Sequence, residues 1–277
     1  MALRILARLA AVAVVLALDG ASGGARGASR HTAEYQWLHL DRHPVKWGSP
    51  QAGAGTEVTY AFVTGPIHHA DARNCRDMVP LDGLLEQSAV PQGVMEREAA
   101  AAFAMWQAAA DIRFRRVEDQ DAAQILIGAQ ATPRGIAFAD VAYNPTASAG
   151  IRRISRSLIC LNPQKPWKVG FGGDVTVYDL RYAIAHEAGH AIGLDHPSPS
   201  GQLMSFRYDE LFRDLQPGDV AGVVALYGPR HAATTSVRPS PAASVLVDAG
   251  CRIDRDNTIL NTALAPRSAG CVGVPAR

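Results

Sequence analysis

The sequence predicts an α+β fold in which helices pack against a twisted mixed β-sheet. Three observations indicate this class: short β-rich runs recur along the chain, two segments carry apolar residues at helical spacing, and the order is strand, helix, several strands, helix. The 277 residues are 48% apolar and 19% charged, so the chain has enough apolar residues for a sizeable core.

The first strand and the first helix are read from their apolar spacing. Val58, Tyr60 and Phe62 are not interrupted by charge, which predicts a strand over residues 57–64. After Pro91 the period changes to that of a helix. The apolar residues at this spacing are Met95, Ala99, Ala102, Phe103, Trp106 and Ala110.

Four further strands are expected between this helix and the next one. Ile112 and Phe114 alternate with arginines, and residues 124–127 form a second β-rich run that ends at Gly128. The other two runs are residues 136–141 and 157–161.

The second helix carries the residues that point to chemistry. Thr176, followed three residues later by Asp179, predicts a capping box, and Gly193 predicts the helix end. His186 and His190 are one helical turn apart, so both imidazoles can reach one cation. Once the chain turns at Gly193, His196 can supply a third nitrogen.

Three histidines favour a catalytic zinc ion over a structural one. They leave one tetrahedral position open, whereas structural sites usually close it with a fourth protein ligand and prefer cysteine. Glu187 lies next to the first ligand, so it could take a proton from a water on the metal. A zinc ion that only holds the structure together is the alternative.

The string from His186 to His196, HEAGHAIGLDH, resembles the zinc-binding signature of metzincin endopeptidases, and Met204 in GQLMS resembles their Met-turn methionine, a packing residue. Residues 102–117 resemble the first helix and the following strand of the matrixins, and residues 215–228 resemble their final helix. The resemblance covers about residues 45–228. It implies a metzincin-type domain with a five-stranded mixed sheet, two long helices, and a lower subdomain with the Met-turn and a C-terminal helix. Residues 157–161 would be the antiparallel edge strand that binds substrate.

The resemblance implies a secreted zinc-dependent endopeptidase with Glu187 as general base, acting on protein or peptide substrates as a monomer. Phe206 and Tyr208 match the Pro-x-Tyr segment that lines the matrixin specificity pocket, although Tyr208 could be an ordinary surface or core tyrosine. Phe206 stands where serralysins have a tyrosine ligand, so such a ligand is excluded. The alternative function is a zinc-stabilised binding or adhesion protein without turnover.

The expected cofactor is one catalytic Zn²⁺. No histidine occurs in residues 70–185, so the second, structural zinc of matrixins is not expected. Asp140, Asn144 and Asp174 could bind Ca²⁺, although loop carboxylates of this kind are more often solvated.

The ends of the chain predict its compartment and its domains. Residues 1–25 combine two arginines, an apolar run of about ten residues and a small-residue stretch, which is typical of a signal peptide and too short to span a bilayer. We therefore expect secretion to the extracellular space or periplasm, without stable membrane insertion. Residues 26–230 would form the catalytic domain, and residues 231–277 a linker and short tail.

Charge and cysteines complete the sequence predictions. The net charge of +1 gives no electrostatic reason to expect nucleic acid as a partner. Disulfides persist outside the cytoplasm. We expect Cys75 to pair with Cys160 and Cys251 with Cys271, although four cysteines permit three pairings.

Overall fold

The computed structural model describes residues 34–145, 150–230, 252–253 and 259–260. The chain divides into two compact units, residues 1–231 and 232–277. In the second unit, β14 (Arg252–Ile253) and β15 (Ile259–Leu260) form an antiparallel pair. The predicted signal peptide and the Cys251–Cys271 pair lie outside the described residues.

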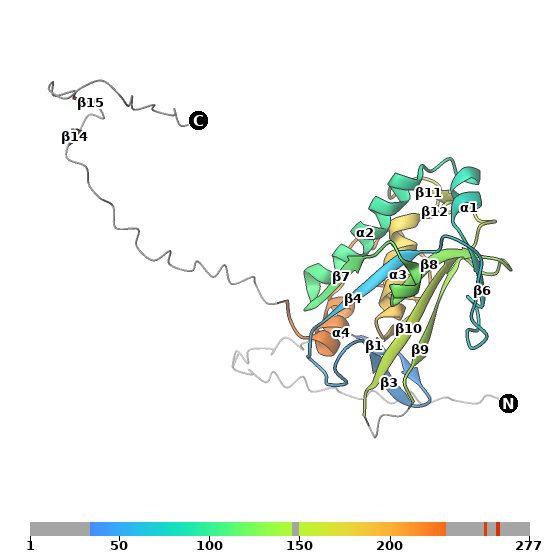
Figure 1. Ribbon diagram of the computed structural model, residues 1–277, viewed down its shortest axis with the longest axis horizontal. Coiled ribbons are helices and arrows are strands. Elements are labelled where there is room, and N and C mark those ends of the chain that lie inside the picture. The colour runs from blue at the N-terminus through green and yellow to red at the C-terminus, as the bar shows by residue number, and fades with distance from the viewer. Residues whose placement is uncertain (1–33, 146–149, 231–251, 254–258, 261–277) are drawn as a thin grey trace, which may run out of the picture. The chain divides into compact units, whose positions relative to one another are not determined.

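The first unit contains a mixed sheet with helices packed against it, which confirms the predicted fold class (Figure 1). Its five long strands run in the order β7-β4-β8-β10-β9, and only β9 is antiparallel to its neighbour. Their bounds are β4 (Thr56–Phe62), β7 (Ile112–Arg116), β8 (Ile125–Gln130), β9 (Ala137–Tyr143) and β10 (Arg152–Leu161).

Short strands that the sequence did not predict extend this sheet and form small pairs beside it. Four of them join it: β2 (His39–Leu40), β3 (His43–Lys46), β5 (Ile67–His68) and β6 (Asp77–Val79). The others pair two by two: β1 (Gln36–Trp37) with β13 (Leu194–Asp195), and β11 (Trp167–Lys168) with β12 (Tyr178–Asp179).

The predicted edge strand is wrong. Residues 157–161 belong to β10, which pairs with β8 on one side and with β9 on the other. Within the described residues β9 pairs with β10 alone, so β9 is the edge strand. Burial explains the order, because residues 157–161 are all buried, as an interior strand requires, whereas every residue of β9 is half-buried.

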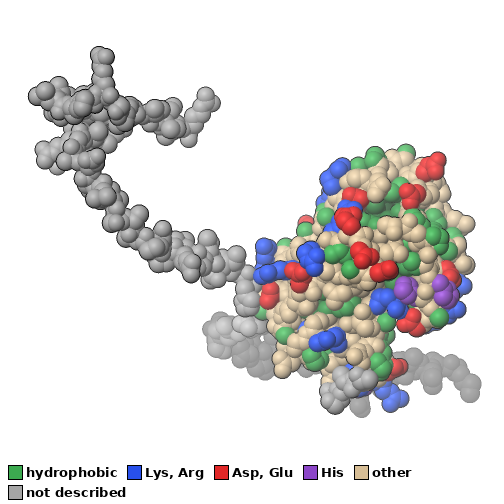
Figure 2. Space-filling view, in the orientation of Figure 1, with side chains coloured by type: hydrophobic (Ala, Val, Ile, Leu, Met, Phe, Trp, Pro, Cys, Tyr) green, Lys and Arg blue, Asp and Glu red, His purple; other side chains and the backbone are tan. Residues whose placement is uncertain are grey.

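Helices α2 (Gln92–Ala109) and α3 (Leu180–Ala191) lie side by side against one face of the sheet (Figure 1). The apolar positions predicted for the first helix are buried in this layer. Two more helices are α1 (Asp82–Gln87), which was not predicted, and α4 (Pro217–Tyr227), which follows the Met-turn segment. No helix in the described ranges has the length and apolar character needed to cross a membrane. Figure 2 shows acidic and basic side chains interspersed on one face, in line with the near-zero net charge.

The predicted capping box of Thr176 and Asp179 at α3 is wrong. Asp179 is the N-cap itself, and its carboxylate accepts a hydrogen bond from the Tyr182 amide. The Thr176 hydroxyl instead donates to Asp174, in the loop before the helix. The helix therefore begins at Leu180, three residues later than a Thr176 cap would place it.

The second face of the sheet carries a smaller apolar cluster that includes Cys75 and Cys160. These two cysteines form a disulfide with an S–S distance of 2.04 Å, in agreement with the expected pairing. The bond ties the segment between β5 and β6 to the interior strand β10.

Replacing both cysteines (Cys75→Ala and Cys160→Ala) is expected to lower the melting temperature by about 10 °C. The disulfide joins residues 85 apart, and the chain-entropy model gives about 4 kcal/mol for a loop of that length. Calorimetry of both proteins with and without reductant measures the effect. Reductant should lower the wild-type value and leave the variant unchanged; a variant as stable as the oxidised wild type would contradict the prediction.

Candidate metal centre

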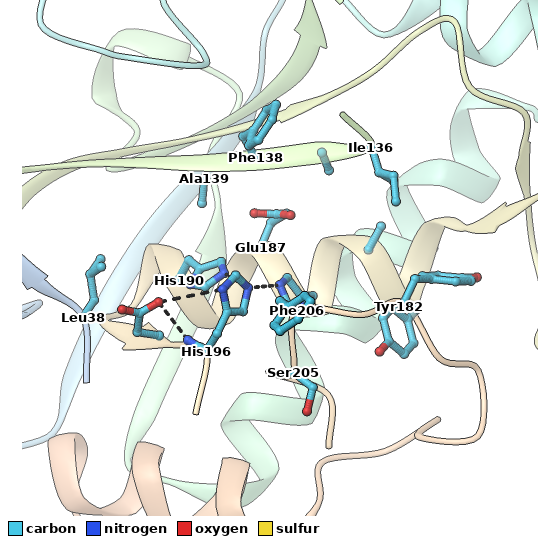
Figure 3. A pocket seen from close by; sticks show the side chains of 15 residues that line it. Leu38, Ile136, Phe138, Ala139, Tyr182, Glu187, His190, His196, Ser205 and Phe206 are labelled. Carbon is cyan, nitrogen blue, oxygen red and sulfur yellow. Dashed lines mark hydrogen bonds and ion pairs between the residues drawn. The ribbon is translucent and has the colours of Figure 1, made fainter. Parts of the chain in front are cut away.

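Three imidazoles converge at the carboxyl-terminal half of α3 (Figure 3). The Nε2 atoms of His186 and His190 each lie 3.0 Å from Nε2 of His196. The first two rings are one helical turn apart, and the third arrives after the chain turns at Gly193. That glycine has φ +105°, and a Cβ there would meet the Val45 carbonyl oxygen, so the turn requires glycine.

Hydrogen bonds fix which nitrogen faces the centre. Nδ1 of His186 donates to the Leu203 carbonyl at 2.7 Å, and Nδ1 of His190 donates to the Leu194 carbonyl at 2.8 Å. Because a carbonyl oxygen only accepts, the proton of each ring is on Nδ1 and the Nε2 lone pair is free. Lone pairs that converge on one point need a cation between them, and neutral imidazole nitrogens are ligands that zinc favours.

Burial keeps these imidazoles neutral. Burial, together with the smaller effect of the neighbouring rings, lowers the pKa of His186 to about 3 and that of His190 to about 4. Burial also lowers the pKa of His196. The three side chains therefore hold unprotonated nitrogens at neutral pH, as metal binding requires.

Tryptophans from two other elements set the position of α3. Trp106 of α2 donates its indole N–H to the carbonyl of Ala185, one residue before His186. Trp47, just after β3, donates to the carbonyl of Ala191 at the helix end, and so does the Ser157 hydroxyl. The segment with two of the three imidazoles is thus held at both ends.

Glu187 is buried between α3 and the edge strand β9, with 7% of the residue exposed. Burial and, to a smaller extent, the charge of Asp140 raise the pKa of its carboxyl to about 8, against the opposing effect of a hydrogen bond from the Ala139 amide. Figure 3 shows this carboxyl between the imidazoles and β9. It is therefore placed to exchange protons with a molecule in the cleft.

The Met-turn residue lies beneath the helix and is positioned by α4. The backbone amides of Leu203 and Met204 both donate to the buried carboxylate of Asp219 at 3.0 Å. Met204 is itself buried and packs against α3 at Gly189. Asp219 was not singled out from the sequence, because its role depends on amides fifteen residues away.

Gly189→Ala is expected to destabilise the domain by about 1–3 kcal/mol. A Cβ at position 189 would overlap the Met204 sulfur and crowd Trp106, and this overpacking outweighs the gain of about 1 kcal/mol in helix propensity. Denaturant unfolding with and without Zn²⁺ measures the cost. Gly93→Ala in α2 is the control, since a Cβ there meets only an arginine end at 3.7 Å. Equal stability of the two variants would contradict the prediction.

A cavity of about 410 Å³ opens beside the imidazoles and Glu187. Phe206 lies at its rim with 57% exposure, its ring centroid 6.2 Å from that of His196. Tyr208 and Tyr182 line it with rings 4.7 Å apart in an edge-to-face contact. Tyr182 was not predicted as a site residue, although its position four residues before His186 places it on the same helix face.

The residues expected to bind calcium have other partners. Asp140 accepts hydrogen bonds from the backbone amides of Asn74 and Cys75, and Asp174 accepts from Thr176. Among the described residues, the three histidines form the only cluster of at least three His, Cys, Asp or Glu side chains suited to a metal ion. Calcium binding stays a prediction.

Comparison with known families decides where this architecture belongs. Residues 84–228 match the family model described as Matrixin, and this range contains all three histidines, Glu187 and Met204. The chain belongs to the matrixin family.

Relatives of this matrixin come from plants, viruses and animals. Metalloendoproteinase 1-MMP of Arabidopsis thaliana is 32% identical over 134 residues, which are 46% of this chain and 36% of the plant protein. Probable matrix metalloproteinase 095L of Invertebrate iridescent virus 3 is 32% identical over 81 residues, 28% of this chain and 22% of the viral one. Matrix metalloproteinase-19 of Mus musculus is 47% identical over 58 residues, 20% of this chain and 11% of the mouse one. The matches thus span little more than a third, or less, of each relative's length.

Proposed function

We propose that this matrixin is a secreted zinc-dependent endopeptidase. The observation that carries the proposal is the convergence of three imidazole Nε2 atoms next to a buried glutamate, in a cleft bordered by an edge strand. The Cys75–Cys160 disulfide supports secretion, because such bonds persist in oxidising compartments. The predicted signal peptide, residues 1–25, is part of the same proposal.

His186, His190 and His196 would hold the zinc ion. A zinc ion bound by three imidazoles makes a bound water more acidic and polarises a carbonyl oxygen. The positive charge of the metal would favour the ionised form of the Glu187 carboxyl, which would then take the proton from the attacking water and pass it to the nitrogen of the leaving amine. Met204 has no chemical role in this scheme; it packs beneath the helix that carries two of the ligands.

The edge strand β9 would hold an extended substrate. Because β9 pairs only with β10 among the described residues, its other edge offers backbone groups that a peptide can pair with as an added strand. Phe206 and Tyr208 would then be walls of the cavity that takes one apolar side chain of the peptide. This assigns to residues 137–143 the role that the sequence analysis gave to residues 157–161.

Incubation of the purified protein with casein or gelatin tests the function. We expect cleavage that o-phenanthroline abolishes and added Zn²⁺ restores. Stoichiometric zinc with no proteolysis of any peptide in a proteome-derived library would refute the proposal. That result would favour the alternative, a zinc-stabilised binding protein. The buried carboxyl beside the imidazoles speaks against this alternative, because a binding protein has no need of a proton acceptor there.

A further inference from the structure

Two loops meet beside the cavity, and only the first of them contributes residues to its lining. Residues 205–214 carry Phe206 and Tyr208, and residues 167–179 precede α3. The Tyr208 hydroxyl connects the two loops, because it accepts the Asp179 amide at 2.7 Å and donates to the Glu210 carboxylate. The Tyr208 ring also packs edge-to-face on Tyr178, with centroids 5.1 Å apart.

A buried ion pair joins the same two loops. Lys168 Nζ lies 2.7 Å from Glu210 Oε1, and the two side chains are only 18% and 6% exposed. Lys168 also donates to the carbonyls of Gly172 and Asp174, both at 2.9 Å, while the Gly172 amide donates to the other Glu210 oxygen at 2.5 Å. Removing one partner would leave the other charge buried without a counterion, which is costly.

The Glu210 carboxyl is ionised in this setting. Burial acts to raise its pKa, but hydrogen bonds from Lys168 and from two other donors outweigh that effect and hold the pKa below its ordinary value. An ionised carboxylate is a strong acceptor for the Tyr208 hydroxyl. The position of the Tyr208 ring therefore depends on the lysine, although the two residues are forty positions apart.

These contacts leave the metal centre itself untouched. No hydrogen bond or ion pair in the described structure links Lys168 or Glu210 to His186, Glu187 or His190. What the pair fixes is the tyrosine wall, since Tyr208 packs on Tyr182 and the Tyr182 oxygen accepts the Asp209 amide at 3.3 Å. Both tyrosines line the cavity and pack on each other, so a shift of Tyr208 would change the shape of the cavity at that end.

We propose that the Lys168–Glu210 pair is a positioning device that limits the size of the apolar side chain the cavity accepts, by holding Tyr208 in the wall. This inference rests on the proposed peptidase function. With the pair intact, Tyr208 stays in the wall, and smaller apolar side chains such as leucine are favoured. With the pair broken, Tyr208 is free to move and larger aromatic side chains enter.

The test uses Lys168→Met and Glu210→Gln, with Glu98→Gln as the matched control. Glu98, whose side chain is 10% exposed, forms an ion pair at 2.6 Å with the more exposed Arg181, and it lies on α2 outside the cavity lining. Two peptides are compared that differ at one position only: the residue whose side chain enters the cavity is leucine in one and tryptophan in the other. We expect the tryptophan-to-leucine ratio of kcat/KM to rise about tenfold in both variants, mainly through KM of the tryptophan peptide, and to stay unchanged in the control.

Tyr208→Phe tests whether the pair acts through the hydroxyl. The variant keeps the ring and loses both of its hydrogen bonds, so it should shift the ratio in the same direction. If Tyr208 transmits the effect, Tyr208→Phe combined with Glu210→Gln shifts the ratio no further than Tyr208→Phe alone. Additive shifts would overturn the proposal, as would an unchanged ratio in Lys168→Met and Glu210→Gln.

Inhibitor binding separates this inference from the proposed function. Hydroxamate peptides that carry a leucine or a tryptophan side chain need the zinc and the cavity but no turnover, so their Kd ratio should shift as the kcat/KM ratio does. If the protein cleaves no peptide but shows this shift in the Kd ratio, only the proposed peptidase function would be refuted. Equal Kd ratios in wild type and variants would refute the positioning role whatever the activity.

Discussion

Glu187→Gln is expected to reduce kcat/KM for peptide cleavage by about 10²–10⁴ while the protein keeps its zinc. The amide has nearly the shape of the carboxyl, and the three imidazoles do not depend on it. It cannot, however, take a proton from the attacking water. The measurements are cleavage of a quenched fluorescent peptide and the zinc content by mass spectrometry.

Glu98→Gln serves as the control for this prediction too. Glu98 is also a buried carboxylate, with 7% exposure, but its partner Arg181 lies outside the cavity lining. This variant should retain most of the wild-type activity. A Glu187→Gln protein with more than a tenth of wild-type activity would remove Glu187 from the mechanism.

His190→Ala is expected to abolish stoichiometric zinc binding and, with it, all measurable proteolysis. The substitution removes one of three nitrogens, and it leaves the Leu194 carbonyl without its 2.8 Å donor, so the turn toward His196 loosens as well. In the wild type, zinc should raise the melting temperature, because a ligand that binds only the folded state stabilises it. In the variant this zinc-dependent rise should disappear.

His39→Ala is the matched control for the ligand variant. His39 is exposed, lies outside the cavity lining, and donates a hydrogen bond from its ring to the nearby Trp37 carbonyl at 2.8 Å. The His39→Ala protein should bind one zinc ion and show the wild-type increase in melting temperature. One tightly bound zinc ion in His190→Ala would contradict the assignment of this nitrogen as a ligand.

The parts of the site that local spacing determines could be predicted. His186 and His190 are brought together by a single helical turn, and His196 by the turn at one glycine, so no distant contact is needed to foresee their proximity. The order of the strands in the sheet, by contrast, cannot be predicted from local spacing. Residues 136–141 and 157–161 are both short apolar runs, and only pairing across the sheet decides which of them is the edge.

Residues whose position depends on distant partners escaped prediction for the same reason. Asp219 acts on the Met-turn through amides on another segment, and Lys168 meets Glu210 across two loops. Neither residue type stands out in its own sequence context. The start of α3 was misplaced because Thr176 and Asp179 both fit a cap locally, and the side chain of Thr176 has a closer acceptor in Asp174.

The pairing of β1 with β13 defines a practical cloning boundary. Leu38 lines the cavity and its amide donates to the Gly193 carbonyl at 2.8 Å, while Trp47 anchors the end of α3. Strand β1, Leu38 and Trp47 all lie before residue 84, where the matched family region begins. A recombinant fragment trimmed to residues 84–228 would therefore lack the segment that holds the third imidazole's loop, so expression should begin no later than residue 34.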